Sequence, residues 1–552
     1  MGSMQTLIDN DAVARLVNRD VSLFSVDVDQ RQAIKQRLGW TDLAEKAVAR
    51  LPQVTTLASA MRAEGVRDVV VLGMGGSSLA SLVMASVLGP VPDDSRLHVL
   101  DTTSPQECAR LLASLNPAET AFVLASKSGT TLEPLSLYAI FRAWMDEALG
   151  RVTAGRHFVV ITDPGSDLER RRQKDIMRIA LLAPPTVGGR FSALSLFGLA
   201  PTALAGIDVT AVVEHALATE KACRSRAEDN PGAHLAAWIA DAYAAGRDKL
   251  TFVASPRYTS FGVWIEQLVA ESTGKRGHGV VPVPEDGGVP PEAYGRDRAL
   301  VVMREADDSK VSNFAEAARV AGVPVMEFVL SEPAAIGGEF VRWTFAVGLL
   351  GHLLGVNPFD EPDVAKAKAA TVEVLNGKAA VPRARVDLDG VWPTFAGGLA
   401  SAPDPAGLEE AIVSLLTTAR SGDYLAVLAY LPYDEALLAP LRSACREASA
   451  SLSVPACVEM GPRYLHSTGQ LHKGGPDSGV FLMITTRDQT DVAIPGAPYT
   501  LSQLFRAQAE GDLVTLSEAK RRILRLDLPS AEPSALTRVA DAIARGARNV
   551  RT

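Results

Sequence analysis

The sequence predicts an α/β protein built on parallel sheets, and three observations lead to this prediction. Short apolar runs alternate with longer stretches of helical periodicity, which is typical of βαβ units. This alternation stops and then starts again further along the chain. A segment rich in Pro, Gly, Ala and Asp over residues 380–420 marks a boundary before a last region. We therefore expect two parallel-sheet units followed by a C-terminal α/β region.

The first unit is expected over residues 61–207, after a helical and polar-faced N-terminal segment at 1–60. Its predicted strands lie at 66–72, 97–100, 121–125 and 157–162. Helical patterns follow the first and third of these strands. Because parallel neighbours need a crossover connection, this spacing predicts a parallel sheet covered by helices.

The second unit is expected over residues 208–380, with strands at 249–254, 299–303 and 325–330 and helices ending at 272 and spanning 340–354. The C-terminal region, residues 381–552, shows strand patterns at 424–430 and 480–485, a helix near 434–450 and a charged tail. No internal sequence repeat is evident, although the first two units can still share a fold.

The bulk composition excludes several classes of protein. Hydrophobic residues make up 47% of the 552 residues, enough for more than one core, which excludes a disordered chain. The formal net charge of −9 argues against a nucleic-acid partner. No run reaches the roughly 18 apolar residues that span a membrane. The start, Met1-Gly2-Ser3-Met4, is unlike a secretory signal, so we expect a cytoplasmic protein. These four residues resemble a cloning remnant.

The cysteines carry no metal signature. They are scattered along the chain without the paired spacing of a zinc site, at Cys108, Cys223, Cys445 and Cys457. We expect free, mostly buried thiols in a reducing compartment, and no metal.

Two loops that follow predicted strands in the first unit could hold a phosphate. The loop Gly73-Met74-Gly75-Gly76-Ser77-Ser78 lets a ligand approach the backbone and opens a helix, whose free N–H groups favour an anion. A dinucleotide fold is the alternative, but Ser78 replaces the third glycine of that fingerprint. The loop 126–131 packs four hydroxyls and Lys127 into six residues, which suits one phosphate better than a pyrophosphate.

Glu271 is the candidate proton carrier. It lies at the last turn of a helix that Gly274 ends, with Gln267 one turn earlier on the same face. The negative end of the helix dipole should raise the pKa of Glu271, which suits a base. A solvated terminal glutamate is the alternative. Arg190, after two glycines, could bring a fixed guanidinium inward.

Three histidines are candidates for an acid–base partner. His466 and His472 lie in the only dense cluster of histidines and polar residues, the Gly-rich stretch 465–475, and His278 follows Glu271 closely. A structural role for each is the alternative, because most lone histidines are structural.

Five motifs together resemble the phosphoglucose isomerase family. They appear in family order over about residues 70–370, and they are Gly73-Met74-Gly75-Gly76-Ser77, Ser126-Lys127-Ser128-Gly129-Thr130-Thr131, Gly188-Gly189-Arg190-Phe191-Ser192, 267–275, and 355–360 leading to Lys368. The resemblance implies two sugar-isomerase domains of flavodoxin-like type with an active site between them. It implies isomerisation of glucose 6-phosphate and fructose 6-phosphate through an enediolate, without a cofactor.

The resemblance also implies roles for individual residues. Glu271 would move the proton between C2 and C1, Arg190 would stabilise the enediolate, and Lys368 would assist ring opening. The remaining positions would bind substrate: Ser126, Lys127, Ser128 and Thr131 as the phosphate cradle, with Gly76, Ser77 and Gln267 near the sugar.

The chain departs from the family in two places. Glu361 stands where a glutamine is usual, seven residues before Lys368. The family's ring-opening histidine usually follows the catalytic glutamate closely. Here the matching residues lie after Lys368, and they are His466-Ser467-Thr468-Gly469-Gln470. In the ordinary family this histidine crosses the interface of a homodimer. Whether His466 acts in its own subunit or in a partner stays open.

The late histidine block resembles the isomerase half of bacterial fusions of transaldolase with phosphoglucose isomerase, and residues 16–43 resemble the junction helix of such fusions. Three functions remain as alternatives at this point. They are a glucose 6-phosphate isomerase, a module that senses sugar phosphates without turnover, and an isomerase of another substrate such as mannose 6-phosphate.

Overall fold

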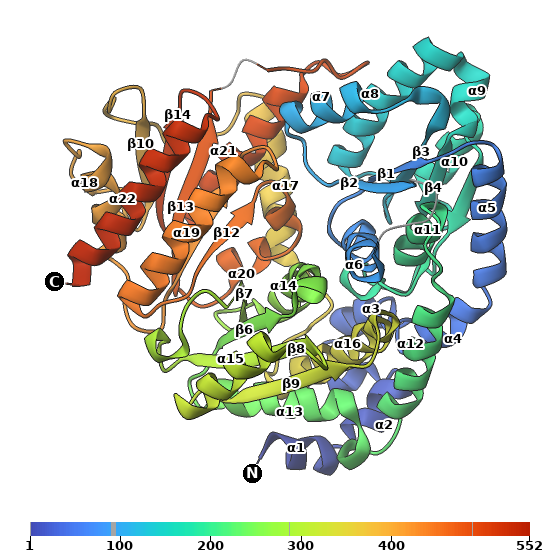
Figure 1. Ribbon diagram of the computed structural model, residues 1–552, viewed down its shortest axis with the longest axis horizontal. Coiled ribbons are helices and arrows are strands. Elements are labelled where there is room, and N and C mark those ends of the chain that lie inside the picture. Colours follow the sequence, from blue (N-terminus) through green and yellow to red (C-terminus); the bar gives the residue numbers. More distant parts are fainter. Residues whose placement is uncertain (1, 90–94, 286, 488–489, 552) are drawn as a thin grey trace.

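The computed structural model describes residues 2–551 apart from 90–94, 286 and 488–489, and it has the predicted α/β class. Three separate sheets are covered by helices (Figure 1). In spatial order, the first sheet comprises β2 (Arg96–Leu100), β1 (Asp68–Leu72), β3 (Thr120–Ala125), β4 (Phe158–Thr162) and β5 (Ile179–Leu182). All of its pairings are parallel.

The second sheet is also parallel, and the third is parallel except at one edge. The second comprises β7 (Val281–Glu285), β6 (Lys249–Ala254), β8 (Arg298–Glu305) and β9 (Val325–Leu330). The third comprises β12 (Ala456–Met460), β11 (Tyr424–Ala429), β13 (Gly479–Thr486), β14 (Arg522–Leu528) and β10 (Trp392–Gly397), which runs antiparallel to β14.

All three sheets share one strand order. Counting the parallel strands of each sheet along the chain, the second strand lies at one edge, followed by the first, third and fourth. The expectation that the first two units are alike in fold is thus confirmed. The C-terminal region, predicted only as an α/β extension, has the same order of parallel strands.

The helices of the first unit surround the first sheet, whereas the first helices of the N-terminal segment pack against helices of the second unit. The N-terminal segment contains α1 (Ser3–Asp9), α2 (Ala12–Val17), α3 (Val28–Lys35), α4 (Leu43–Val48) and α5 (Leu51–Ala63). The first unit contains α6 (Leu79–Leu88), α7 (Pro105–Ser114), α8 (Leu132–Leu149), α9 (Arg151–Arg156), α10 (Asp167–Lys174) and α11 (Leu196–Leu204). The prediction of a single junction helix over residues 16–43 is wrong, because short helices separated by turns occupy this stretch.

The later helices cover the second and third sheets. The second unit contains α12 (Thr210–Cys223), α13 (Pro231–Ala244), α14 (Thr259–Thr273), α15 (Ser309–Val320), α16 (Ile336–Leu353) and α17 (Pro362–Leu375). The C-terminal region contains α18 (Leu408–Leu416), α19 (Glu435–Leu452), α20 (Gly469–Gly474), α21 (Leu501–Glu518) and α22 (Pro533–Arg551). The charged tail expected at the C-terminus is therefore mostly the helix α22, which packs against α18 and α19.

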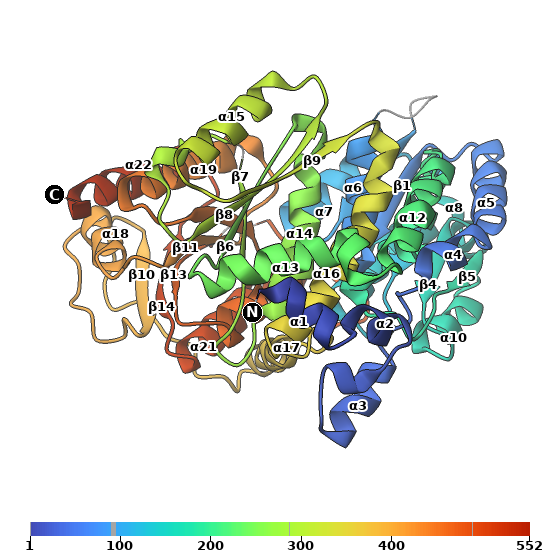
Figure 2. The same cartoon turned by 90° about the horizontal axis from the view of Figure 1, so that it is seen from below.

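The hydrophobic cores tie these parts together. One core joins the N-terminal helices to the first and second sheets. Leu501 and Leu504 of α21 join the core on the other face of the first sheet, and Ala270 of α14 belongs to a core of the third sheet. Figures 1 and 2 both place α14 and α17 between the first unit and the C-terminal region. A site between the units would therefore be formed by helices that pack against both neighbouring parts of the chain.

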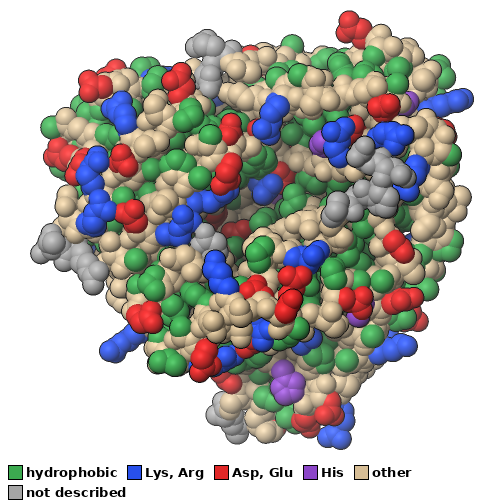
Figure 3. All heavy atoms as spheres, in the orientation of Figure 1, with side chains coloured by type: hydrophobic (Ala, Val, Ile, Leu, Met, Phe, Trp, Pro, Cys, Tyr) green, Lys and Arg blue, Asp and Glu red, His purple; other side chains and the backbone are tan. Residues whose placement is uncertain are grey.

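The described part of the chain contains no helix that is both long and apolar enough to cross a bilayer. Figure 3 shows the surface in the orientation of Figure 1. This face is hollowed near its middle, between the first unit and the C-terminal region, and charged side chains of both signs gather around the hollow.

Candidate active site

The two predicted phosphate loops lie at the same edge of the first sheet. They follow β1 and β3, which are parallel neighbours, and the carboxyl ends of parallel strands meet at one edge. The loop after β1 continues through a 3₁₀ turn, Gly75–Ser77, before α6 begins. The loop after β3 runs directly into α8, whose N-cap is Thr131. The helix N-termini therefore face the same region as the loops.

The hydroxyls of the loop after β3 hold one another in place. Ser126 Oγ lies 2.9 Å from Thr131 Oγ1 and accepts a hydrogen bond of 3.1 Å from the backbone N–H of Gly129. Ser128 Oγ lies 2.9 Å from Thr130 Oγ1. Gly129 has φ +74°, a left-handed conformation that favours glycine. This compact turn of hydroxyl and N–H groups suits an anion.

The sequence predicts that the amino group of Lys127 faces this turn, but the structure shows it bound to other groups. Its Nζ forms an ion pair with Asp163 and donates a hydrogen bond of 2.8 Å to the carbonyl oxygen of Pro185. Two acceptors thus engage this amino group, and one of its three N–H donors is left for another partner.

Gly76 brings two chain segments into close contact. A Cβ atom at Gly76 would lie 2.1 Å from the carbonyl oxygen of Gly189, so only glycine fits there. Ser192 Oγ donates a hydrogen bond of 3.0 Å to the carbonyl oxygen of Gly76. This contact joins the loop after β1 to the turn that carries Arg190.

Arg190 is buried and contacts several acceptors. Its Nη1 lies 3.4 Å from Glu271 Oε1 and 3.1 Å from Glu361 Oε2. Its Nη2 donates hydrogen bonds to the carbonyl oxygens of Pro358 and Asp360, at 2.7 and 3.1 Å. Burial acts to lower the pKa of Arg190, but Glu271 and Glu361 outweigh it and raise that pKa. The guanidinium stays charged and fixed in orientation.

Glu271 is buried at the end of α14, which Gly274 terminates as expected. The pKa of Glu271 is raised, chiefly by burial. The nearby Glu361 adds to this rise, whereas Arg190 opposes it. The direction matches the expectation from the helix dipole, but loss of hydration is the main physical cause. The alternative interpretation of Glu271, a solvated glutamate at the end of a helix, is therefore wrong.

Gln267 links Glu271 to the C-terminal region. Its Nε2 donates to Glu271 Oε2 at 3.2 Å and to the carbonyl oxygen of His466 at 2.8 Å. Both partners are buried. One amide group therefore connects the candidate proton carrier to the segment that holds the candidate ring-opening histidine.

His466 lines a cavity of about 220 Å³ together with residues of the phosphate loop and Lys368. Its Nε2 lies 2.8 Å from Glu133 Oε1, and Gln508 of α21 donates to the same oxygen at 2.8 Å. Burial acts to raise the pKa of Glu133, but His466 and Lys368 outweigh it and hold that pKa below its usual range. An ionised Glu133 thus fixes the imidazole beside the cavity.

The other two candidate histidines lie elsewhere. His278 is exposed. His472 is buried among aromatic rings, with its Nε2 3.3 Å from Glu459 Oε1. Neither lines the cavity. Among the three, His466 is the histidine that the fold brings to the phosphate loop.

Three neighbours of the site had not been singled out from the sequence. Glu133 stands two residues after Thr131, so the phosphate loop itself was a signal for it. Lys275, which lies 2.8 Å from Asp360, has its pKa lowered to about 8 by burial and by Arg190. Gln508 comes from a helix 375 residues beyond Glu133, and no local pattern indicated it.

Metal-ligand clusters are missing from the described residues: no group of three or more His, Cys, Asp or Glu side chains could hold a metal ion there. The four cysteines are free thiols, as expected, and three of them are buried.

Comparison with known proteins agrees with this picture. The parallel sheets and the strand-end loops define a protein of the sugar-isomerase fold class. A family profile described as "Phosphoglucose isomerase" matches residues 5–280, which is half of the chain. The chain therefore belongs to the phosphoglucose isomerase family. The matched span includes Glu271 and Arg190 but ends before Lys368 and His466.

Curated relatives bear a matching name, and solved structures share the fold. A glucose-6-phosphate isomerase of Mycoplasmopsis pulmonis is 28% identical over 62% of this chain and 90% of its own. One from Thermus thermophilus is 30% identical over 62% and 91%. A hypothetical protein of known structure, also from Thermus thermophilus, superposes with a TM-score of 0.58 at 26% identity, over 67% of this chain and 96% of its own. A Chlamydia trachomatis glucose-6-phosphate isomerase, at 17% identity and a TM-score of 0.53 over 67% and 86%, shares the fold.

Proposed function

We propose that the chain catalyses the reversible isomerisation of glucose 6-phosphate and fructose 6-phosphate. Family membership supports this reaction, and curated relatives bear the name glucose-6-phosphate isomerase. The observation that carries the proposal is the meeting of His466 with Glu133 at 2.8 Å, across 333 residues of sequence. This contact supports a role for His466 as an acid–base group beside the phosphate loop, and Gln267 links its segment to Glu271.

In the proposed first step, the phosphate binds to the hydroxyls of Ser126, Ser128 and Thr131 and to the N-terminus of α8. His466 and Lys368 then open the sugar ring: one group takes the proton of the anomeric hydroxyl and the other gives a proton to the ring oxygen, as the bond between that oxygen and the anomeric carbon breaks. The ionised Glu133 supports this role, because it holds the imidazole in one orientation, as in other acid–base pairs.

In the proposed second step, the Glu271 carboxylate removes the proton from C2 and returns it to C1, while the proton of the C2 hydroxyl passes to the oxygen on C1. The electron pair of the broken C–H bond forms the double bond of a cis-enediolate, and the negative charge develops on the oxygen bound to C1. The fixed guanidinium of Arg190 is suited to stabilise that charge, because a preorganised cation needs no reorientation during reaction. The raised pKa of Glu271 favours a base near neutral pH.

The position of His466 supports a site that is complete within one chain. The contacts from His466 to Glu133 and Gln267 are all intrachain. We infer that the C-terminal region takes over the part that a partner subunit plays in the ordinary family. The sugar-facing Gly76 and Ser77 lie at the neighbouring strand end, beside Gly189.

The direct test is turnover of purified protein with either hexose phosphate, in the presence of a chelator. We expect conversion in both directions. Glu271→Gln should lower kcat by about 10³-fold or more, because it removes the proton carrier, while substrate binding survives. Glu316→Gln, which removes an exposed carboxylate on α15, is the control. Binding without turnover in the wild-type chain would overturn the proposal.

A mixing experiment tests whether the site lies within one chain. Glu271→Gln and His466→Asn variants are unfolded together, refolded and assayed against each variant alone. If each site is built from one chain, the mixture has no more activity than the sum of its parts. Recovery of a substantial fraction of wild-type activity would show that His466 acts in a partner subunit.

A further inference from the structure

The third sheet repeats the strand order of the first, and a second cavity lies beside it. In the first sheet, the third strand, β3, leads into the loop proposed to bind phosphate. The equivalent third strand of the C-terminal sheet is β13. Ligands of open α/β sheets bind outside the carboxyl ends of such strands, so the end of β13 is the place to look for a further site.

The register of the two sheets identifies equivalent residues. Ala125 of β3 pairs with Ile161, and the next residue, Ser126, donates its N–H to the carbonyl oxygen of Ile161 at 3.0 Å. Thr486 of β13 pairs with Leu528, and Arg487 donates to Leu528 at 2.9 Å in the same way. Arg487 therefore occupies the position that begins the phosphate loop in the first sheet.

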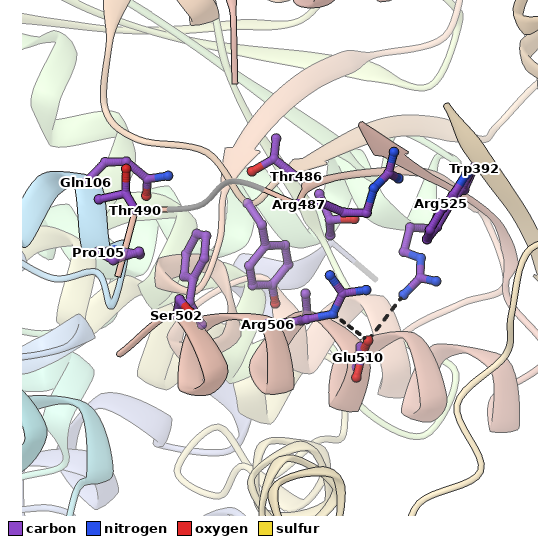
Figure 4. Close-up of a pocket in the computed structure, with 14 residues that line it drawn as sticks. Pro105, Gln106, Trp392, Thr486, Arg487, Thr490, Ser502, Arg506, Glu510 and Arg525 are labelled. Atoms are coloured by element: carbon purple, nitrogen blue, oxygen red, sulfur yellow. Dashed lines mark hydrogen bonds and ion pairs between the residues drawn. The ribbon is translucent and has the colours of Figure 1, made fainter. Parts of the chain in front are cut away.

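The cavity at this position has a volume of about 320 Å³. Figure 4 shows Arg487, Arg506 and Arg525 around it, with Trp392 to one side and Gln106 on the other. We call it the arginine cavity. Hydroxyl groups of Thr486, Thr490 and Ser502 and the rings of Tyr430 and Phe505 complete the lining that matters here. It is large enough for a small metabolite.

Arg525 is the least compensated charge in the arginine cavity. Its side chain is only 7% exposed, yet the nearest carboxylate oxygen, Glu510 Oε1, is 3.9 Å away. Nη2 donates to Thr394 Oγ1 at 3.3 Å, and Nε has no hydrogen-bond partner within the described structure. Burial lowers the pKa of Arg525, and Asp527 and Glu510 oppose this effect without cancelling it. A buried cation of this kind gains stability from an incoming anion.

Among the described residues that line the arginine cavity, three are arginines and one, Glu510, is an acid. Arg506 lies 3.0 Å from Glu510 and 3.3 Å from Asp527, and Arg487 lies 3.6 Å from Asp527. Asp387 is a third carboxylate near this group, since Trp392 and also Arg487 lower its pKa, so the positive excess belongs to the cavity lining and not to the whole cluster. The Arg487 guanidinium also lies over the ring of Trp392, 3.8 Å from its centroid. The cavity therefore combines a lining rich in arginine with a flat aromatic wall.

We propose that the arginine cavity binds the phosphate group of a small phosphate ester, at a site separate from the candidate active site. Arg506 and Arg525 would contact the phosphate, and Thr486 and Ser502 would supply hydroxyl donors. Trp392, Tyr430 and Phe505 would pack against the organic part of the ester. Guanidinium groups suit this ligand because their planar donors match phosphate oxygens in pairs.

The test is calorimetric titration with inorganic phosphate of a chain in which the first loop is disabled, Ser126→Ala with Thr131→Val. We expect this double variant to bind one phosphate per chain. Adding Arg506→Met should weaken that binding roughly 10- to 100-fold, as expected for a lost charge-assisted hydrogen bond. Adding Arg525→Met should weaken it at least as much. The titration measures binding and not turnover, so its result can be interpreted even if the proposed isomerase function fails.

Two controls make the test specific for the arginine cavity. Arg545→Met removes an exposed arginine of α22 that pairs with Glu409, and it should leave the affinity unchanged. Arg506 is 45% exposed, so Arg506→Met remains informative if Arg525→Met fails to fold. The inference is overturned if the double variant binds no phosphate, or if Arg506→Met and Arg545→Met bind it equally well.

Parallel titrations with glucose 6-phosphate and with AMP identify the source of the phosphate. Tighter binding of AMP than of inorganic phosphate, lost in Trp392→Leu, would identify a nucleotide stacked on the aromatic wall. Tighter binding of glucose 6-phosphate would identify a sugar phosphate. In either case the gain over inorganic phosphate supports the proposal. Esters that all bind more weakly than phosphate would overturn the assignment to a phosphate ester.

Discussion

The two halves of the candidate active site differ in how their charges are held. In the half proposed for proton transfer, Arg190 lies within 3.4 Å of a carboxylate oxygen of both Glu271 and Glu361. In the half proposed for ring opening, His466 and Glu133 form one pair. Lys368 is exposed at the cavity and makes no ion pair with any described residue.

This difference indicates how each half would work. The proton-transfer half has its donors and acceptors in place before substrate arrives, which suits electrostatic stabilisation of a short-lived charge. The ring-opening half keeps a cavity and a lysine outside any ion pair of the described chain, which suits groups that must accommodate both a cyclic and an open sugar. Changes in the first half should therefore be the more damaging.

Among changes that leave Glu271 itself in place, the largest effect is expected for Arg190→Met. Loss of the guanidinium should lower kcat by about 10²- to 10³-fold. It also removes the buried cation nearest to Glu271 and Glu361, so the free energy of unfolding should fall by about 3–5 kcal/mol. Steady-state kinetics and urea denaturation measure the two effects. Arg190→Lys restores the charge but not the paired donors, so an activity equal to wild type would argue against orientation as the role of Arg190.

A smaller and more selective effect is expected for His466→Asn. Turnover of fructose 6-phosphate should fall by about 10²-fold, as for loss of a general acid–base group. An analogue that cannot close its ring, 5-deoxyfructose 6-phosphate, should be turned over almost as by the wild-type chain. The exposed His278→Asn is the matched control. Equal losses on both substrates would remove ring opening as the role of His466.

Glu133→Gln should have a still smaller effect. The glutamine keeps a hydrogen bond to His466 but loses the charge that holds the imidazole, so kcat should fall about tenfold, part of the ~10²–10⁴ that an acid–base group contributes. The loss should be confined to substrates that form rings, and KM should change little. A similar loss with 5-deoxyfructose 6-phosphate would instead indicate general disruption of the fold.

The smallest effect is expected for Glu361→Gln, and it should appear in the pH profile. Glu361 helps to raise the pKa of Glu271, so its neutralisation should lower that pKa. Because Glu271 must be deprotonated to act as a base, the acidic limb of the kcat/KM profile should move to lower pH. A limb that stays in place, or moves to higher pH, would show that Glu361 does not act on Glu271.

Much of the fold was predictable because the central strands of each sheet are short, continuous apolar runs. The strands that were missed lie mostly at sheet edges or carry unusual residues. β7 contains Pro282 and Pro284, which weaken a strand signal, and β5 and β12 are half-buried edge strands. β10 follows the Pro- and Gly-rich boundary segment. β14 alternates charged Arg525 and Asp527 with leucines, because one of its faces lines the arginine cavity.

The candidate site was predictable wherever one short loop carries several polar groups. Ser126, Ser128 and Thr131 come together because the loop itself places them. Lys127 instead pairs with Asp163, on the next strand's loop, a partner that no local pattern reveals. The domain boundaries at 60, 207 and 380 remain predictions, although the three sheets fall on either side of the last two.

The pairing of Glu133 with His466 has a consequence for synthesis of the chain. At ribosomal rates of roughly 5–20 residues per second, the 333 residues between them take about 17–67 s to make. During that interval the first unit can fold with its phosphate loop, but Glu133 still faces water without its imidazole. If the proposed roles hold, the nascent chain acquires its phosphate-binding loop well before it acquires the group that opens the ring.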